Sequence, residues 1–126
     1  MRDFFFYTKN PFHQEECYQI IKNEIKEVVL NGDDCIFLNA KWRAYLWLYN
    51  DKLENDVYSS EDELEEVKSI ISIDDPYVNF FEAYRSVEVK KFLKLLLPTF
   101  PELFVKADDE DAYYTAQEYI DTEFDY

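Results

Sequence analysis

Glycine is scarce in this chain, whose 126 residues include one glycine and four prolines. One glycine cannot build the glycine-rich loop that cradles a phosphate group, so nucleotide-binding motifs of that kind are excluded. Few tight turns with positive φ are available either, which favours helices and short connections over a many-stranded sandwich.

Cysteine and long apolar runs are also scarce. Cys17 and Cys35 are the only two cysteines. They make no disulfide framework, and each lies in an apolar pattern, which suits reduced thiols in a cytoplasm. No stretch approaches the length of a membrane span, and the apolar run that follows Arg2 ends too soon for a signal peptide. We therefore expect a cytoplasmic protein with no membrane partner.

Aromatic residues are abundant, with eleven Phe, eleven Tyr and two Trp in a chain that is 48% hydrophobic. Highly charged disordered chains are poor in such residues, so we expect a folded protein. The length is close to the commonest size of a single domain, and no segment has the composition of a linker. Residues 1–126 are therefore predicted to form one domain.

Negative charge is concentrated in the later part of the chain. The net charge is −15, and residues 51–75 and 102–126 each carry a net charge of −8. The segment between them, residues 76–101, has a net charge of +2. Such a local field repels nucleic acid and anionic lipid, and it attracts basic protein surfaces and speeds their encounter.

Hydrophobic periodicity predicts alternating strands and helices. Short apolar or alternating runs predict strands at residues 3–8, 35–38, 44–49, 77–84 and 103–107. Residues 39–43 would join the second and third runs as a hairpin, although one long bent strand fits almost as well. Spacings of three and four predict helices at residues 14–30, 60–73 and 86–97, and after residue 111.

Individual residues refine these helices. Ser60 begins a capping-box pattern, and Ser86 is predicted to cap the third helix. Each helix should bury one apolar stripe. The second stripe is Leu64, Val67, Ile70 and Ile71, the third is Val89, Phe92, Leu93 and Leu96, and the last is Tyr113, Ala116 and Ile120.

The predicted fold class is α+β. A single-domain sandwich, with a mixed or mostly antiparallel sheet of about four to five strands and helices packed mainly on one face, would bury both the strands and the helix stripes.

Three arrangements of residues could indicate chemistry. His13 lies four residues before Cys17, which on a helix would bring a base near a thiol; a buried thiol and a histidine at a helix start is the stronger interpretation. The four consecutive acids from Asp108 could bind a hard cation, but their spacing does not match the calcium-loop pattern. Two Glu-Val-Lys triplets, at residues 66–68 and 88–90, resemble part of a nuclease motif, but they lie on predicted helices. We expect no cofactor, no metal and no catalytic residue.

A hydrophobic core does not account for two features of the sequence, the acidic blocks and the surplus of Tyr and Trp. Eight aromatic residues exceed what a core of this size encloses easily: Trp42, Tyr45, Trp47, Tyr49, Tyr58, Tyr84, Tyr113 and Tyr114. Tyr and Trp beside carboxylates are typical of a tight interface with a basic partner. The predicted partner-binding residues are Asp51, Glu54, Asp56, Tyr58, Glu61, Asp62, Glu65, Asp108, Asp109, Glu110, Asp111, Tyr113 and Tyr114.

Two stretches carry a family resemblance: residues 75–86, DPYVNFFEAYRS, are a predicted strand leading into a helix, and residues 104–109, FVKADD, are a strand followed by an acidic turn. With the size, charge, composition and element order of the whole chain, they resemble the small acidic α+β immunity proteins that neutralise bacterial toxins in contact-dependent and polymorphic toxin systems. The resemblance implies a cytoplasmic inhibitor that is not an enzyme.

The leading hypothesis is therefore a protein that occludes a cognate basic toxin of the nuclease type, with carboxylates in the places of substrate phosphates. An alternative keeps this mimicry of nucleic acid but changes the target to a host defence nuclease, inhibited by a protein of a phage or mobile element. A third hypothesis, a small hydrolase, would use His13 or the carboxylates of residues 108–111. The oligomeric state is left open.

Overall fold

The computed structural model describes residues 2–33, 35–37, 44–53, 60–110 and 112–123. Seven strands form one open antiparallel sheet: β1 (Arg2–Thr8), β2 (Val29–Leu30), β3 (Cys35–Phe37), β4 (Tyr45–Lys52), β5 (Tyr77–Ala83), β6 (Phe104–Ala107) and β7 (Tyr114–Thr115). Their order in the sheet is β2-β3-β4-β5-β1-β6-β7. Four helices complete the fold: α1 (Gln14–Lys22), α2 (Glu61–Ile70), α3 (Ser86–Leu96) and α4 (Ala116–Ile120).

The predicted α+β class and the antiparallel sheet are confirmed, but the expected number of strands was too low. All five expected strands are present, and β2 and β7 add two residues each. A two-residue strand has no periodicity to detect, so sequence patterns do not reveal it. β3 and β4 pair antiparallel, with Cys35 opposite Trp47. The hairpin interpretation is therefore correct, although its link at residues 38–43 lies outside the described residues.

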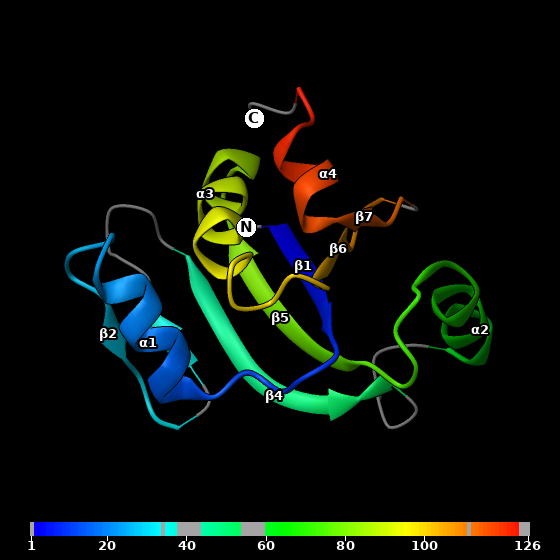
Figure 1. Cartoon of the computed structure of the whole chain (residues 1–126), viewed down its shortest axis with the longest axis horizontal. Helices are drawn as coiled ribbons and strands as arrows, with labels where there is room; N and C mark the ends of the chain where they lie inside the picture. Colours follow the sequence, from blue (N-terminus) through cyan, green and yellow to red (C-terminus); the bar gives the residue numbers. More distant parts are fainter. Residues whose placement is uncertain (1, 34, 38–43, 54–59, 111, 124–126) are drawn as a thin grey trace.

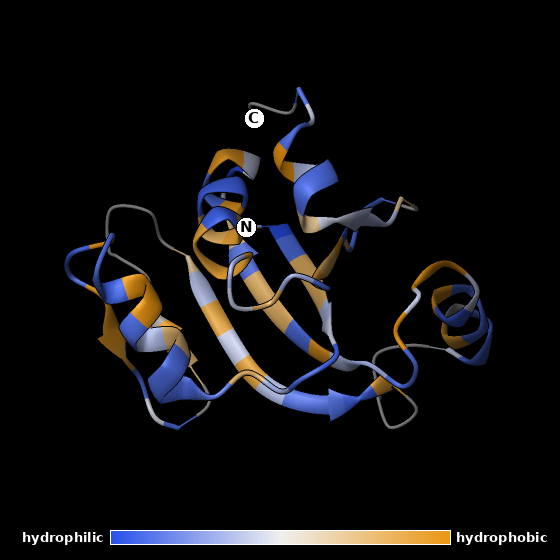
Figure 2. Ribbon diagram, in the orientation of Figure 1, coloured by the Kyte–Doolittle hydropathy of each residue, from blue (hydrophilic) through white to orange (hydrophobic). Residues whose placement is uncertain are grey.

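Alternation along the strands gives the sheet two different faces. In β1, Phe4 and Phe6 belong to one apolar cluster, whereas Phe5 and Tyr7 belong to another. Hydrophobic and hydrophilic bands alternate along β4 in Figure 2. We call the face that bears Phe4 and Phe6 the covered face and the one that bears Phe5 and Tyr7 the open face.

The covered face is sealed by α1, α3 and α4, which Figure 1 shows grouped over the sheet. Phe6, Phe81 and Phe92 have no exposed surface, and the Phe81 and Phe92 rings stack with centroids 4.7 Å apart. The predicted stripe of α3 is confirmed, because Val89, Phe92, Leu93 and Leu96 are all fully buried. This layer contains the main hydrophobic core.

The open face is covered only in part. Val67 and Ile71 pack in the same cluster as Phe5, Tyr7 and Val78, so α2 lies against one end of this face. Figure 1 shows α2 beside the far ends of β4 and β5. The prediction that helices pack mainly on one face therefore holds for three of the four helices, and α2 leaves the rest of the open face without a helix.

Several predicted boundaries were wrong. α1 ends at Lys22 rather than residue 30. Glu27 in the following segment has a positive φ of 70°, and Val29–Leu30 then pairs with β3. Ile70 is 47% exposed, so it does not belong to the buried stripe of α2. Stripes of apolar residues continue past the helix ends here, and only backbone geometry shows where each helix stops.

The caps of α3 and α4 also differ from prediction. Arg85, not Ser86, is the N-cap of α3, and its backbone N–H donates to the Glu88 carboxylate at 3.0 Å. α4 begins only at Ala116, with Thr115 as its N-cap. Thr115 Oγ1 accepts from the Glu118 N–H at 3.1 Å, a capping box that the Thr-x-x-Glu pattern indicates in the sequence. Tyr113 therefore precedes the helix instead of forming part of its stripe.

A buried amide network holds β4 in place beside β5. The register between these strands shifts between Trp47 and Asp51, and Asn50 there has a positive φ of 50°. Its N–H donates to Asn79 Oδ1 at 2.8 Å, and its side chain bonds both the N–H and the carbonyl of Phe12 at 2.8 Å. This network fixes the end of β4 that carries the aromatic residues of the open face.

Candidate functional site

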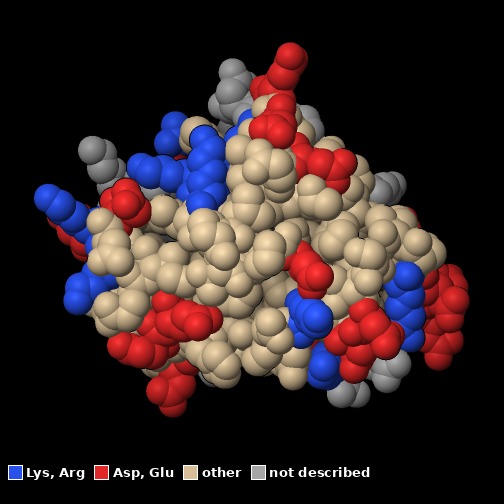
Figure 3. Space-filling model, viewed as in Figure 1, with Lys and Arg blue, Asp and Glu red and all other residues tan. Residues whose placement is uncertain are grey.

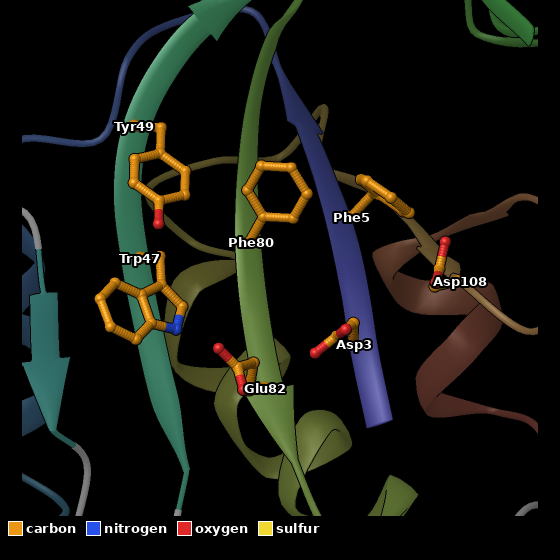
Figure 4. Close-up of a pocket in the computed structure, with 7 residues that line it drawn as sticks. All are labelled: Asp3, Phe5, Trp47, Tyr49, Phe80, Glu82 and Asp108. Carbon is orange, nitrogen blue, oxygen red and sulfur yellow. The ribbon is translucent and has the colours of Figure 1, made fainter. Parts of the chain in front are cut away.

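A cavity of about 360 Å³ lies on the uncovered part of the open face. Figure 4 shows its lining, which comes from β1, β4, β5 and the turn after β6. Four aromatic residues and three carboxylates line it: Phe5, Trp47, Tyr49, Phe80, Asp3, Glu82 and Asp108.

The floor of the cavity is aromatic because alternate residues of three neighbouring strands point to this face. Phe80 of β5 stands between Trp47 of β4 and Phe5 of β1 in the sheet register. Its ring meets Phe5 edge to face at 5.0 Å between centroids and Tyr49 at 5.5 Å. Tyr49 is 42% exposed and its ring is nearly parallel to that of Trp47, at 16°. The rings support one another and still present surface to a ligand.

The rim carries three carboxylates at adjacent positions. Asp3 and Glu82 are directly opposite each other across β1 and β5. The Asp108 N–H donates to the Asp3 carbonyl at 2.9 Å, so the backbone of the third acidic residue lies beside that of Asp3. Like charges directly opposite on a sheet are destabilising. Across the described residues, no ion pair compensates any of the three.

One polar atom of the floor lacks a partner. Trp47 Nε1 is buried and has no hydrogen-bond acceptor among the described residues. Figure 4 shows this nitrogen on the edge of the indole that faces Glu82. A buried donor without an acceptor costs free energy. The unpaired indole N–H and the carboxylates without ion pairs are both polar groups that do not stabilise the fold, and both lie at this cavity.

The predicted residues of the second acidic block are divided in their roles. Asp108 lines the cavity. Asp109 and Glu110 instead form ion pairs with Arg2, at 2.9 and 3.0 Å, and the Arg2 guanidinium holds the pKa of Asp109 below its usual value. Asp111 lies outside the described residues. This block is therefore partly neutralised within the molecule.

The two predicted tyrosines lie on different faces. Tyr113 is half-buried on the open face, where its ring lies 6.2 Å from that of Tyr7 and 5.7 Å from Lys106 Nζ. Tyr114 packs against Tyr119 of the main core, with ring centroids 5.5 Å apart. They therefore pack against different hydrophobic clusters.

The first acidic block lies mainly on α2. Glu61, Asp62 and Glu65 are exposed there and line a separate hollow with Leu64 and Lys68. Asp51 is half-buried at the end of β4, and residues 54–59, which include Glu54, Asp56 and Tyr58, lie outside the described part of the chain. Figure 3 shows acidic side chains over α2 and the end of α4, and basic side chains gathered over α3. The structure does not gather the two blocks into one site.

Sequence reasoning missed four of the seven residues around the cavity: Asp3, Phe5, Phe80 and Glu82. Trp47 and Tyr49 had been noted only as surplus aromatic residues. A signal existed, since Asp3 and Phe5, like Phe80 and Glu82, share one face of their strands. What the alternation does not reveal is that the two strands are neighbours.

The structure does not pair His13 with Cys17 as a base and a thiol. His13 is exposed and precedes α1, whereas the Cys17 side chain is fully buried. Burial, and secondarily the Glu16 carboxylate, raises the pKa of the Cys17 thiol to about 12, so it is not a thiolate at neutral pH. Both Glu-Val-Lys triplets lie on helices, α2 and α3. Within the described ranges, no three His, Cys, Asp or Glu side chains form a group that could hold a metal ion.

Comparisons with known proteins add no family. No family model matches the chain, and no curated protein or solved structure is significantly similar to it. Among the described residues, no helix is both long and apolar enough to cross a membrane.

Proposed function

We propose that this chain is a non-enzymatic inhibitor that binds a basic partner protein on the open face of its sheet, in the way that immunity proteins bind the toxins they neutralise. One observation carries the proposal: three carboxylates without an ion-pair partner among the described residues line the same cavity as four aromatic residues. A cationic surface would supply the missing partners.

The balance of charge and apolar area supports a protein partner. Trp and Tyr contribute large contact areas at low entropic cost, and they are enriched among residues that dominate binding energy. The carboxylates would orient a basic surface and accelerate its approach. Nucleic acid would be repelled by the same charges and by a net charge of −15.

The acidic residues of α2 extend this surface without joining the cavity. Glu61, Asp62 and Glu65 are exposed on the helix that packs against the other end of the open face. Their field would steer a basic protein toward that face, because exposed charges act on association rate more than on affinity. A cytoplasmic nuclease toxin, whose own substrate is polyanionic, fits this description.

The second candidate target is a host defence nuclease, inhibited by a protein from a phage or mobile element. Both targets offer a cationic nucleic-acid-binding surface, so one cavity would serve for either. The genes beside the coding sequence separate them, because an immunity gene should adjoin a toxin gene whereas a counter-defence gene should lie among phage genes.

The decisive experiment is to co-express the chain with the product of the adjacent gene. We expect a stoichiometric complex in size-exclusion chromatography and protection of the host cell from that product. A double variant, Asp3→Asn with Glu82→Gln, should weaken the complex by at least tenfold. Glu24→Gln removes one exposed charge after α1, away from the open face, and should leave the complex intact.

Absence of both a complex and protection would contradict the proposal for that neighbour. A complex that survives the double variant would show that the chain binds its partner elsewhere. Hydrolytic activity of the purified chain that is lost on His13→Ala would instead support the hydrolase hypothesis.

A further inference from the structure

We propose that the cavity on the open face receives one arginine side chain of the partner, with its guanidinium group lying on the aromatic floor between the carboxylates of the rim. This inference rests on the proposed function, because it names the group through which the basic partner is recognised.

The first argument is the shape of the floor. Trp47 and Tyr49 lie side by side on β4 with their rings only 16° from parallel, and Tyr45 continues the row at 21° from Trp47. These rings form a flat apolar strip. A planar guanidinium stacks on such a surface through cation–π and dispersion contacts, whereas a lysine ammonium is a compact, strongly hydrated charge that gains less from it.

The second argument is the arrangement of acceptors. Asp3, Glu82 and Asp108 belong to three consecutive segments across the sheet, and their backbones are fixed by the β1–β5 register and by the Asp108–Asp3 hydrogen bond. Five guanidinium N–H donors in a planar fork can be shared among several carboxylate oxygens at once. Because the acceptor carboxylates come from different segments of the sheet, they favour a guanidinium with several N–H donors over an ammonium with a single centre of charge.

The two cations nearest the rim among the described residues, Arg2 and Lys106, are directed to other groups. Arg2 is next to Asp3 in sequence, yet its guanidinium is directed to Asp109 and Glu110, at 2.9 and 3.0 Å. Lys106 is opposite Phe5 in the register, and its ammonium lies over the Phe5 and Tyr113 rings, 5.8 and 5.7 Å from their centroids. Among the described residues neither cation forms an ion pair with the rim, so the rim keeps its charge for a ligand.

The size of the cavity limits what it can hold. At about 360 Å³ it lies near the lower end of the 300–1,000 Å³ that is usual for ligand sites. One extended side chain fits such a volume, whereas a folded segment of the partner would have to rest on its margin. The cavity is thus suited to a single anchoring residue at the centre of a larger interface.

The test uses three acetylated and amidated tripeptides, Gly-Xaa-Gly, in which Xaa is arginine, lysine or citrulline. Citrulline keeps the planar shape of arginine without its charge. The protein carries Trp42→Phe, which leaves Trp47 as its only indole, since the chain has two Trp. Indole fluorescence and amide NMR shifts are followed at low ionic strength, where exposed charges are least screened.

We expect the arginine peptide to bind with a dissociation constant in the millimolar range, about tenfold tighter than the lysine peptide, and the citrulline peptide to show no saturable binding. The shifted amides should belong to β1, β4 and β5 around the cavity. Glu82→Gln should weaken arginine binding by about tenfold, whereas Glu24→Gln, which removes the same charge far from the cavity, should not.

Equal binding of the three peptides, or shifts confined to α2, would overturn the arginine assignment, and so would a Glu82→Gln variant that binds as well as the parent. Circular dichroism of each variant checks that the fold is kept, and Tyr49→Ala offers a second, exposed test of the floor with Val87→Ala as its control of similar exposure. This titration needs no partner protein. If no arginine peptide binds, the arginine assignment is wrong, but a complex with the adjacent gene product would still support the proposed function. If that complex does not form, the titration still tests whether the cavity binds arginine.

Discussion

The two faces of the sheet use the same strands and similar aromatic residues to different ends. Phe81 and Phe80 are consecutive, yet the first is fully buried under the helices and the second is half-buried in the floor of the cavity. The covered face is almost wholly apolar. The open face keeps a carboxylate pair in register and an indole N–H without an acceptor among the described residues. Stability explains the first face, whereas the second contains features that oppose it, as expected if the proposed binding role is correct.

The strongest test of this contrast is to truncate the two neighbouring phenylalanines. Phe81→Ala should lower the free energy of unfolding by about 3–5 kcal/mol, because it leaves a void among the stacked rings of Phe6 and Phe92. Phe80→Ala removes a half-buried ring and should cost about 1–2 kcal/mol. Urea denaturation measures both, and equal costs would mean that the open face is as much a core as the covered one.

The reactivity of Cys17, measured in a Cys35→Ala variant, tests how tightly the helices cover the covered face. Because burial raises the pKa of Cys17 to about 12 from an ordinary 9.0, its thiolate fraction at pH 8 should be about a thousandfold lower than in the unfolded chain. Alkylation by iodoacetamide should slow at least in that proportion. The same shift makes the free energy of unfolding fall as the pH rises from 9 toward 12, since the unfolded state loses its proton first. Alkylation at the unfolded rate would show that the helical layer opens readily.

Asn79 is a polar residue on the covered face and is fully buried. Asn79→Ala removes the acceptor of the Asn50 N–H, so we expect a loss of about 1–3 kcal/mol in the free energy of unfolding. Thermal denaturation gives the value. Asn10→Ala, at an exposed position before α1, is the control. A neutral Asn79→Ala would mean that the register shift in β4 does not depend on this network.

The smallest effect has the opposite sign. Asp3→Asn should raise the free energy of unfolding by about 0.2–1 kcal/mol, because it relieves the repulsion from Glu82 across the strands. The gain should shrink in about 0.5 M salt, which screens exposed charges. Paired with weaker binding of the partner, it would show that the rim exchanges stability for recognition. A destabilised variant would mean instead that Asp3 is held by favourable contacts.

Much of the fold follows from periodicity. The run from Asp3 to Thr8, the alternation from Ala44 to Tyr49 and the stripe of α3 each have one dominant reading, and the structure confirms all three. Where the periods mix, the prediction fails: Ile25 and Val28 continue the spacing of α1 although the helix has already ended. The two-residue strands have no period, and they form because a neighbouring strand provides the hydrogen-bonding edge.

The cavity was much harder to anticipate. Three charged residues line it. Glu82 is 79 positions after Asp3 in the sequence and Asp108 is 105 positions after it, and only the β1–β5 and β1–β6 pairings bring the three residues together. The predicted partner-binding residues were chosen mainly from the two acidic blocks, where acidic residues are close together in the sequence. In the structure two carboxylates of the second block are paired with Arg2, whereas two isolated acids outside both blocks form most of the rim. Local density of charge is therefore a poorer guide to a site than strand register.

The position of β1 has a consequence for how the chain is made. It is synthesised before β5 and β6, yet it pairs with both, and the partners of its Phe4 are Phe81 and Ala107. The ribosome must therefore reach β5 before the Phe-Phe-Phe-Tyr run gains its first neighbour, and β6 before it gains its second. Pairings so distant in sequence fold slowly, and the nascent aromatic segment remains open to aggregation in the meantime. Yield in the cell should consequently depend on chaperones and growth temperature more than the equilibrium stability alone would indicate.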